Sequence, residues 1–438
     1  MIKQKIIFSK EEFLRQCAQS GVELPYSDGI GILREPFKIS GKLAPNRIAY
    51  QPMEGADGAL DGSPDELTAR RYKRFARGGA GIIWIEACAA EYEGRANPRQ
   101  LFISGENLDG FKRLAEIIRQ TSLAANGYSP IIILQLTHSG RYSRGADGPM
   151  PLVAYRNPVL EKGKEKLFYK VLSDGELERT GERLAAGAKL AQEAGFDGAD
   201  IKCSHGYLLA ELLSAYARQG KYGGTFENRT GLLTDTVRAA VSLTKNGFIV
   251  ASRLNIYDGF EYPYGFGVRE GCGLLPDYSD AVTLTQKLRG AGLSLLNITM
   301  GNPYVNPHVN RPFASGDYDS GEHPLAGVAR MLHGTAVVRK AVPDLPVVAS
   351  ALSYLGAAAG QVAAGCIADG MFDFAGWGRA AFANPDTANE ILFDKKLEIG
   401  NLCLTCGGCT KMMRAGLPAG CPVRDKTYAD IMKGGKGG

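Results

Sequence analysis

The sequence predicts an α/β protein folded as a (β/α)8 TIM barrel, with an N-terminal extension and a C-terminal cysteine-rich tail. Eight short apolar runs alternate with helical patterns, and the runs are apolar on both faces, as in a buried parallel sheet. An open doubly wound sheet is the competing fold. That fold expects a glycine-rich turn after the first strand, whereas Pro52-Met53-Glu54 follows it here.

The expected elements follow one another in strict alternation. The eight strands are expected at residues 47–51, 80–86, 130–136, 198–202, 248–254, 294–298, 346–350 and 372–376. Helices with apolar residues at three- and four-residue spacing are expected at 108–125, 176–194, 227–246, 277–291 and 327–342.

Three regions are expected along the chain: an extension over 1–33, the barrel over 34–395 and the tail over 396–438. The extension contains one expected helix, Lys10–Ser20. Ser9 precedes it as an N-cap, and Glu12 stands three residues later, which is the spacing of a capping box.

Composition and charge exclude several classes of protein. The 438 residues are 45% hydrophobic and 22% charged, and the formal charge is +5 without a Lys/Arg run, so we expect no nucleic-acid surface. Residues 1–10 do not resemble a signal peptide. The uncharged stretch 347–368 is interpreted as a buried strand followed by a small-residue helix, not a membrane span. We therefore expect a soluble cytoplasmic protein that does not bind membranes.

Polar side chains cluster at the carboxyl ends of the expected strands, where TIM barrels carry their chemistry. Chance would scatter them to both ends, so the pattern indicates an active site. These residues are Glu54, Glu86, Gln135, His138, Arg141, Lys202, His205, Tyr207, Arg253, Asn302 and Arg379.

The fourth strand ends in three hydrogen-bond or proton donors, Lys202, His205 and Tyr207. A strand end that bends into a loop can aim such groups at a ligand, because its backbone is held rigidly from behind. The alternative is an ordinary surface loop with satisfied polar residues. The strand-end pattern of the other strands favours function.

Two long segments, 137–174 and 299–323, follow strands at the same face, and we expect them to act as lids or substrate-recognition loops. For His138 and Arg141, packing beneath the third-strand loop and contact with substrate are equally supported. After the last strand, Gly376-Trp-Gly378-Arg379 and the turn at 351–356 predict a phosphate site of the kind that loops seven and eight form in barrels.

Four of the nine cysteines are clustered. Cys403, Cys406, Cys409 and Cys421 follow the pattern C-x2-C-x2-C-x11-C, which predicts a metal centre. The spacing does not separate an iron–sulfur cluster from structural zinc, and free thiols are the remaining alternative. The other five are scattered, as buried thiols usually are.

Taken together, several blocks resemble the old yellow enzyme family of flavin-dependent oxidoreductases. Among them are Ala194-Gly-Phe-Asp-Gly198 and Tyr222-Gly-Gly-Thr-Phe-Glu-Asn-Arg229. All occur in family order between about residues 33 and 390. The blocks are residues 46–53, 78–87, 135–141, 194–198, 205–208, 222–229 and 378–386.

The resemblance implies FMN across the mouth of the barrel. Gln135 would bond the pyrimidine edge of the flavin, and Arg253 would lie near its N1 and O2, stabilising the charge that develops on reduction. Arg379 and the amide of Gly378 would hold the phosphate. The remaining residues of the expected cofactor site are Pro52, Met53, Glu54 and Ser350.

The resemblance also implies the roles of the fourth-strand residues. Positions 202 and 205 would clasp the oxygen of the substrate's activating group, and Tyr207 would deliver a proton to one alkene carbon while flavin N5 delivers hydride to the other. Lys202 departs from the family, which has His there. The Lys202 ammonium would bind a carboxylate or enolate, act in proton transfer with a lowered pKa, or turn away to pair with a carboxylate.

Glu54 is the second departure, at a position where relatives often have a small residue or a cysteine. A covalent thiol link to flavin is therefore not available there. A carboxylate beside the flavin would make its reduction harder, unless a neighbour neutralises it.

The tail resembles the [4Fe–4S] motif of the 2,4-dienoyl-CoA reductase and trimethylamine dehydrogenase branch, in which nucleotide-binding domains follow. This chain stops at Gly438, so we expect electrons from NAD(P)H, from a separate redox protein such as ferredoxin through the cluster, or from a partner subunit.

Three functions are therefore considered. The first is reduction of a C=C bond conjugated to a carbonyl or carboxyl group of a small molecule. The second is an amine or other dehydrogenase that passes electrons out through the cluster. The third is a non-redox lyase with a Lys202 Schiff base and a structural zinc tail. A homo-oligomer is left open.

Overall fold

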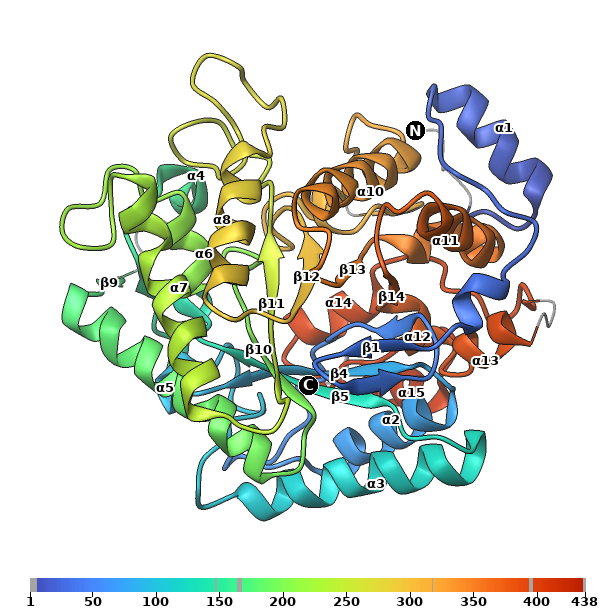
Figure 1. The fold of residues 1–438 in the computed structure, drawn as a ribbon, viewed down its shortest axis with the longest axis horizontal. Coiled ribbons are helices and arrows are strands. Elements are labelled where there is room, and N and C mark those ends of the chain that lie inside the picture. The colour runs from blue at the N-terminus through green and yellow to red at the C-terminus, as the bar shows by residue number, and fades with distance from the viewer. Residues whose placement is uncertain (1–5, 146–147, 164–167, 317, 394–396, 436–438) are drawn as a thin grey trace.

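The computed structural model describes residues 6–145, 148–163, 168–316, 318–393 and 397–435, and its centre is a closed barrel of eight parallel strands (Figure 1). All eight expected strands form, and the predicted TIM barrel is confirmed. In spatial order the barrel strands are β3 (Ile48–Tyr50), β4 (Ile82–Ala89), β5 (Ile131–Thr137), β10 (Gly198–Ile201), β11 (Ile249–Asn255), β12 (Leu295–Thr299), β13 (Val347–Ala349) and β14 (Phe374–Trp377).

Every residue of these strands is buried, because the inner face fills the barrel and the outer face packs on helices. The interior is filled by large side chains such as Trp84, Ile133, Ile249 and Phe374. Burial on both faces explains why the strands are continuous apolar runs in the sequence.

The five expected helices form, with ends shifted by at most three residues. The helices of the barrel region are α2 (Glu66–Arg77), α3 (Leu108–Asn126), α5 (Asp174–Glu193), α6 (Leu208–Leu213), α7 (Phe226–Leu243), α8 (Ser279–Gly290), α10 (Pro324–Ala341), α11 (Ala359–Ala368), α12 (Arg379–Ala383) and α13 (Thr387–Leu392). The 3-10 turns are η1 (Gly31–Arg34), η2 (Tyr92–Gly94), η3 (Gly140–Tyr142) and η4 (Leu352–Ala358).

The N-terminal part covers one side and one end of the barrel (Figure 1). Helix α1 (Lys10–Ser20) begins as expected, with the Ser9 hydroxyl accepting the Glu12 N–H at 3.2 Å, and it contacts α10 and η4. A hairpin that the sequence did not predict, β1 (Phe37–Ile39) with β2 (Lys42–Ala44), joins the barrel interior cluster. Its Phe37 ring meets Phe374 edge-on at 5.3 Å.

The two long segments after β5 and β12 contain short elements of their own. The first has β6 (Arg144–Gly145), β7 (Gly148–Pro149), β8 (Leu152–Val153), α4 (Pro158–Glu161) and β9 (Lys170–Val171), and the second has α9 (Pro307–Asn310). Residues 347–368 form β13 and α11, joined by η4, as expected. In the part of the chain that the structure describes, no helix combines the length and apolarity needed to cross a membrane.

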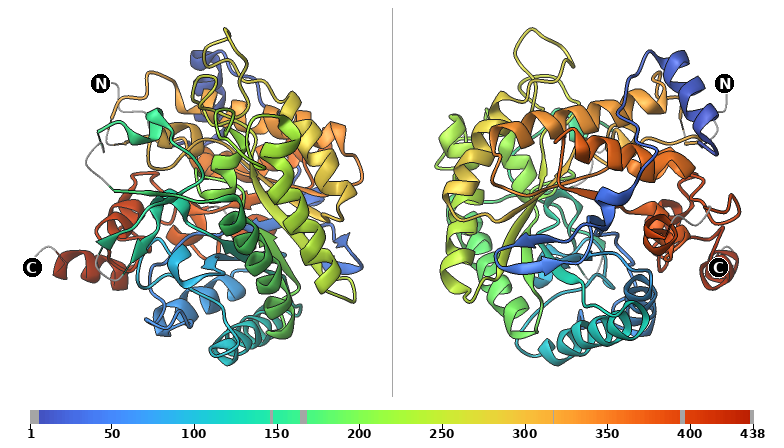
Figure 2. Two further views of the ribbon diagram at one scale, coloured as in Figure 1. Left: turned by 90° about the vertical axis from the view of Figure 1, so that its left-hand side faces the viewer. Right: turned by 45° about the vertical axis from the view of Figure 1, so that its right-hand side comes forward.

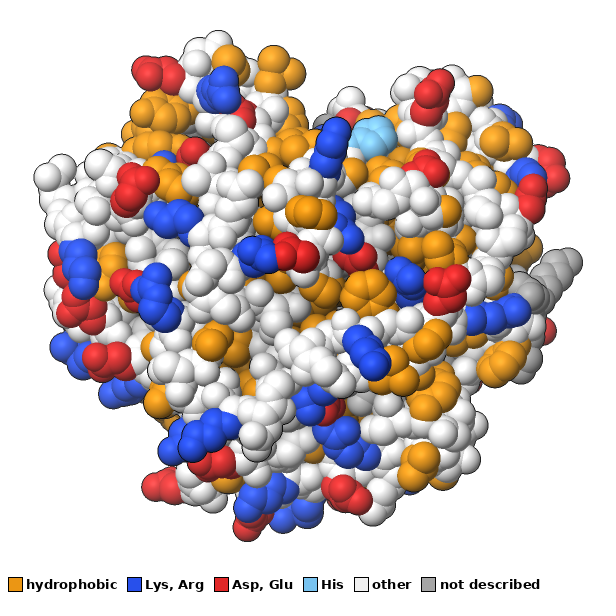
Figure 3. Space-filling model, in the orientation of Figure 1, with side chains coloured by type: hydrophobic (Ala, Val, Ile, Leu, Met, Phe, Trp, Pro, Cys, Tyr) orange, Lys and Arg blue, Asp and Glu red, His pale blue; other side chains and the backbone are white. Residues whose placement is uncertain are grey.

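The cysteine-rich tail lies against the barrel as a separate group of short helices (Figure 2). It carries α14 (Gly408–Arg414) and α15 (Lys426–Gly434). Asp425 at the start of α15 pairs with Arg70, at 2.8 Å, and with Arg74 of α2. The Ala419 N–H donates to the Gly55 carbonyl at 2.6 Å, which ties the tail to the loop after β3. On the face in Figure 3, basic and acidic side chains are interspersed.

Candidate active site

An open cavity lies at the carboxyl ends of the strands. Every residue expected to act in catalysis or to bind the cofactor lines it, and the two sets therefore share one site. These residues are Pro52, Met53, Glu54, Gln135, Lys202, His205, Tyr207, Arg253, Ser350, Gly378 and Arg379.

The buried carboxylate of Asp200 organises the floor of the cavity. Asp200 is the direct partner of Gln135 across β10 and β5, and its Oδ2 accepts Gln135 Nε2 at 2.7 Å and Trp84 Nε1 at 3.0 Å. Its Oδ1 accepts the backbone N–H of Arg253 at 2.6 Å. One carboxylate thus links four strands and orients the Gln135 amide.

Arg253 lines the cavity, and one of its donors is unused. Burial lowers the pKa of its guanidinium to about 10, and the charge of Asp200 opposes this shift. Its buried Nε has no hydrogen-bond partner among the described residues. Such a donor normally meets an acceptor, so Arg253 fits the electron-rich pyrimidine edge of a flavin.

Another part of the cavity is built from tightly packed strand ends and turns. A Cβ at Gly376 would lie 2.1 Å from Gln51 Nε2 and 2.4 Å from the Ala349 carbonyl, so only glycine fits. Ala351 has a φ of +73°. Arg379 begins α12 beside these turns, and its guanidinium donates to the Pro312 carbonyl at 2.7 Å. These residues fit the expectation that Gly378 and Arg379 would hold the phosphate of FMN.

His205 lies at the end of the fourth barrel strand in a strained backbone conformation. Its φ is +66°, and its N–H donates to Asn255 Oδ1 at 3.3 Å. Burial lowers the pKa of the imidazole well below its usual value, and Arg253 and Lys202 lower it further. His205 is therefore neutral at physiological pH and can donate a single N–H to an oxygen in the cavity.

Tyr207 and Glu54, which both line the cavity, are hydrogen-bonded to each other. The Tyr207 hydroxyl donates to Glu54 Oε1 at 2.9 Å and lies 3.3 Å from the Tyr304 hydroxyl. Burial raises the pKa of Tyr207 well above its usual value, and the charge of Glu54 raises it further. Tyr207 is thus a neutral acid that holds its proton until a strong base forms beside it.

The Lys202 ammonium lies over the Tyr207 ring, 3.6 Å from its centroid. Burial lowers the pKa of Lys202 to about 8, Glu54 and Asp200 raise it, and Arg253 lowers it. Of the three expectations for Lys202, the structure thus favours a cation that faces the cavity over one that turns away into a tight ion pair.

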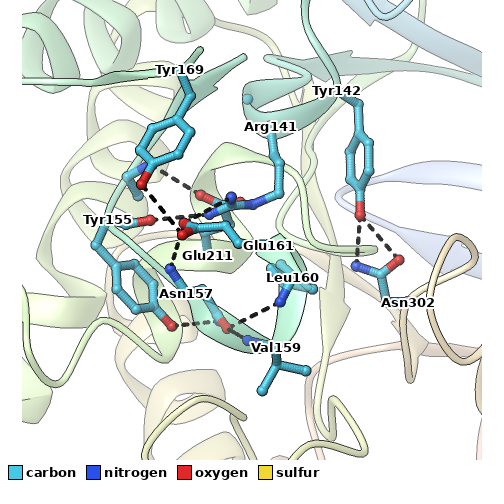
Figure 4. A network of polar contacts seen from close by, with 12 residues as sticks. Arg141, Tyr142, Tyr155, Asn157, Val159, Leu160, Glu161, Tyr169, Glu211 and Asn302 are labelled. Atoms are coloured by element: carbon cyan, nitrogen blue, oxygen red, sulfur yellow. Dashed lines mark hydrogen bonds and ion pairs between the residues drawn. The ribbon is translucent and has the colours of Figure 1, made fainter. Parts of the chain in front are cut away.

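Four of the expected strand-end residues do not line the cavity: Glu86, His138, Arg141 and Asn302. Arg141 is held by Glu211 Oε1 at 2.5 Å, by Glu161 at 3.3 Å and by the Tyr155 carbonyl at 3.0 Å (Figure 4), so its packing interpretation holds. His138 is buried and its Nδ1 accepts the Gly140 N–H at 3.1 Å. Glu86 pairs with Arg71, beside Asp57, in a buried ion cluster.

Several cavity residues were not predicted from the sequence. From the segment 299–323 come Pro303, Tyr304, Asn310 and Arg311, but among the described residues of 137–174 none reaches the cavity. Tyr142 of segment 137–174 stacks on Tyr304, with ring centroids 3.8 Å apart. Its hydroxyl is hydrogen-bonded to Asn302 (Figure 4). The tail contributes Cys409, Thr410 and Met413, and the other missed residues are Gln51 and Phe382. Ala351, Ser353 and Gly376 also line the cavity, where the phosphate site was expected.

The four tail cysteines are free thiols that lie near one another. Burial raises the pKa of Cys403 to about 12, and Cys409 and Cys421 act on it electrostatically. Among the residues the structure describes, however, no three or more His, Cys, Asp or Glu side chains are arranged to hold a metal ion. The metal centre therefore stays a prediction, and no chemical step is derived through it.

Comparison with known proteins decides the family. The sequence profile of the NADH:flavin oxidoreductase / NADH oxidase family matches residues 33–266, just over half of the chain. The chain belongs to this family. It is a flavin-dependent oxidoreductase, as the old yellow enzyme resemblance implied, and the Schiff-base lyase hypothesis is therefore wrong.

Two curated relatives illustrate the range of the family. An NADPH dehydrogenase of Geobacillus sp. (strain WCH70) is 30% identical over 293 residues, which are 65% of this chain and 78% of the relative. A metal reductase of Desulforamulus reducens is 25% identical over 398 residues, which are 90% of this chain but 53% of the relative.

Solved structures share the fold. A 2-naphthoyl-CoA reductase in complex with 2-naphthoyl-CoA superposes with a TM-score of 0.75 at 20% identity, over 92% of this chain and 58% of that chain. The old yellow enzyme homologue of Zymomonas mobilis gives a TM-score of 0.61 at 21% identity, over 84% and 94%. Histamine dehydrogenase from Rhizobium sp. 4-9 gives a TM-score of 0.70 at 18% identity, over 92% of this chain and 53% of that chain.

The phosphate site expected at Gly378 and Arg379 predicts a selective loss of flavin in Arg379→Ala. A hydrogen bond to a charged group contributes about 1.5–3 kcal/mol, so FMN should bind roughly 10- to 100-fold more weakly. Titration of the apoprotein with FMN, followed by flavin fluorescence, measures this. Arg414→Ala is the matched control, because Arg414 lies outside this cavity, and equal losses in both variants would contradict the assignment.

Proposed function

We propose that the protein is an ene-reductase that reduces a C=C bond conjugated to a carboxyl or carbonyl group. The observation that carries the proposal is the convergence of three groups in the cavity that the expected flavin residues line: a neutral His205, a cationic Lys202 and a protonated Tyr207 hydroxyl. When bound, FMN would supply hydride taken from NAD(P)H. The chain's own residues do the rest.

His205 and Lys202 would hold the oxygen of the activating group. Their hydrogen bonds strengthen as negative charge moves onto that oxygen, so they favour the transition state over the bound substrate. Tyr207 would then protonate the carbanionic carbon. The burial that raises its pKa also matches it to a strongly basic carbon acceptor.

The charges of the cavity favour an anionic substrate. Its described lining has four cations, Lys202, Arg253, Arg311 and Arg379, against one carboxylate, Glu54. A bound FMN phosphate and the pyrimidine edge of the flavin would occupy Arg379 and Arg253. Lys202 and Arg311 then remain for the substrate, which supports an α,β-unsaturated carboxylate.

One relative is named for a substrate of this chemistry. The NADH:acrylate oxidoreductase of Vibrio harveyi is 29% identical over 286 residues, which are 62% of this chain and 26% of that protein. The similarity supports an unsaturated carboxylate only as a class.

A second candidate is a dehydrogenase that passes electrons out through a [4Fe–4S] cluster on the tail. It is supported by the position of Cys409, which lines the flavin cavity, so a cluster there would adjoin the cofactor. We expect iron and acid-labile sulfide in protein purified without oxygen, and their loss in Cys406→Ser. Zinc in place of iron, or no metal, would contradict the cluster.

Tyr207→Phe tests the ene-reductase proposal. Loss of general acid catalysis typically costs about 100- to 10,000-fold, so reoxidation of the reduced flavin by 2-cyclohexenone should slow by that range. Reduction of the flavin by NADPH should be spared. Anaerobic stopped-flow absorbance measures both half-reactions, and an equal loss in both would show that Tyr207 is not the acid.

The lowered pKa of Lys202 predicts a pH dependence for anionic substrates. The ammonium is charged below about pH 8 and neutral above it, so kcat/KM for an unsaturated carboxylate should fall relative to its methyl ester as pH rises through 8. Lys202→Arg keeps its charge and should abolish that fall, whereas Lys202→Met should favour the ester at every pH. An acid-to-ester ratio that is constant with pH in the unmodified enzyme would contradict substrate binding by Lys202.

A further inference from the structure

The proton that Tyr207 would deliver is directed at another residue in this structure. A phenol carries one proton, and the Tyr207 hydroxyl donates it to Glu54 Oε1 at 2.9 Å. While this bond persists, the same proton is not available to a substrate carbon.

The loop that carries Glu54 is fixed from two sides. The Gly55 N–H donates to Glu86 Oε2 at 2.7 Å, and Glu86 is itself held by Arg71 in the buried ion cluster. The Gly55 carbonyl accepts the Ala419 N–H of the tail at 2.6 Å. Glu54 is thus held beside Tyr207 by the barrel and by the tail together.

We propose that Glu54 controls the orientation of the Tyr207 proton and replaces it after each turnover. Ionised, Glu54 accepts the Tyr207 O–H and holds it away from substrate. Protonated, Glu54 donates to Tyr207 Oη, and the Tyr207 O–H is free to point into the cavity. Glu54 acts through Tyr207 and is a positioning and relay residue. The inference rests on the ene-reductase function proposed above.

The protons balance over one cycle. Hydride addition leaves an electron pair on the second alkene carbon, which takes the proton of Tyr207, so a C–H bond forms and the Tyr207 O–H bond breaks. The Glu54 O–H bond then breaks as its proton passes to Tyr207 Oη. Glu54 remains as a carboxylate and regains a proton from solvent through the open cavity.

Charged and titratable groups face Glu54 from each element around it. They are Lys202 and Tyr207 from the loop after β10, Tyr304 from the loop after β12 and Glu86 from β4, and the tail adds the thiol of Cys409 to the cavity wall. Lys202 above the Tyr207 ring also stabilises the transient phenolate, because it places a cation 3.6 Å from the ring centroid.

The test measures flavin reoxidation by 2-cyclohexenone in the FMN-loaded, NADPH-reduced enzyme between pH 5 and 9. In the unmodified enzyme the rate should fall as the pH rises, because the carboxylate form of Glu54 holds the Tyr207 proton and the acid form releases it. Glu54→Gln cannot ionise, and its amide N–H can donate to Tyr207 Oη. This fall should therefore disappear in Glu54→Gln. Near pH 9, flavin reoxidation should be faster in Glu54→Gln than in the unmodified enzyme. Glu54→Asp should restore a pH-dependent rate.

Two control variants separate Glu54 from its neighbours. Tyr304→Phe removes the other hydroxyl partner of Tyr207 and should retain the fall. Lys202→Met removes any pH dependence that the Lys202 ammonium causes. The fall in rate that Glu54 causes should remain in this variant. A Glu54→Gln profile that matches the unmodified enzyme would overturn the inference while leaving the ene-reductase intact. If Tyr207→Phe does not slow reoxidation, the ene-reductase proposal itself fails.

Discussion

The carboxylate of Asp200 is the interaction on which the rest of the site depends. It is buried among β4, β5, β10 and β11, where it accepts Trp84, Gln135 and the backbone of Arg253. Burial raises its pKa, and three hydrogen bonds lower it again. A buried carboxylate is tolerated only when it is bonded in this way. The hydrogen bonds that offset the cost of burying Asp200 are therefore the same ones that align Gln135 and Arg253 at the cavity.

Much of the fold and of the site was predictable from the sequence, because both follow from local patterns and one topological rule. Alternating apolar runs specify the strands, and parallel strands bring their carboxyl ends together, so Gln135, Tyr207 and Arg379 had to meet. The β1–β2 hairpin and the tail's part in the cavity were not predictable. Both depend on contacts such as Phe37 with Phe374, between residues far apart in the sequence, and no local pattern reports these contacts.

Strand-end position alone did not separate residues that face the cavity from those that brace it. Arg141 and Glu86 occupy the same kind of position as Lys202, yet both form buried ion pairs away from the cavity. Arg141 pairs with Glu211, and Glu86 pairs with Arg71. The difference lies in the partners that each side chain meets in the folded chain. Those partners come from other elements, so they become visible only in three dimensions.

The two departures from the family pattern, Glu54 and Lys202, are 148 positions apart in the sequence but meet at Tyr207. Glu54 raises the pKa of Lys202 and so opposes the effect of burial on the ammonium. Either residue alone would leave an uncompensated charge beside the flavin, whereas together they add a proton acceptor and an anion-binding cation without a net charge. We therefore expect the two residues to act as one unit in the proposed reaction, with the substrate preference set by the pair more than by Lys202 alone.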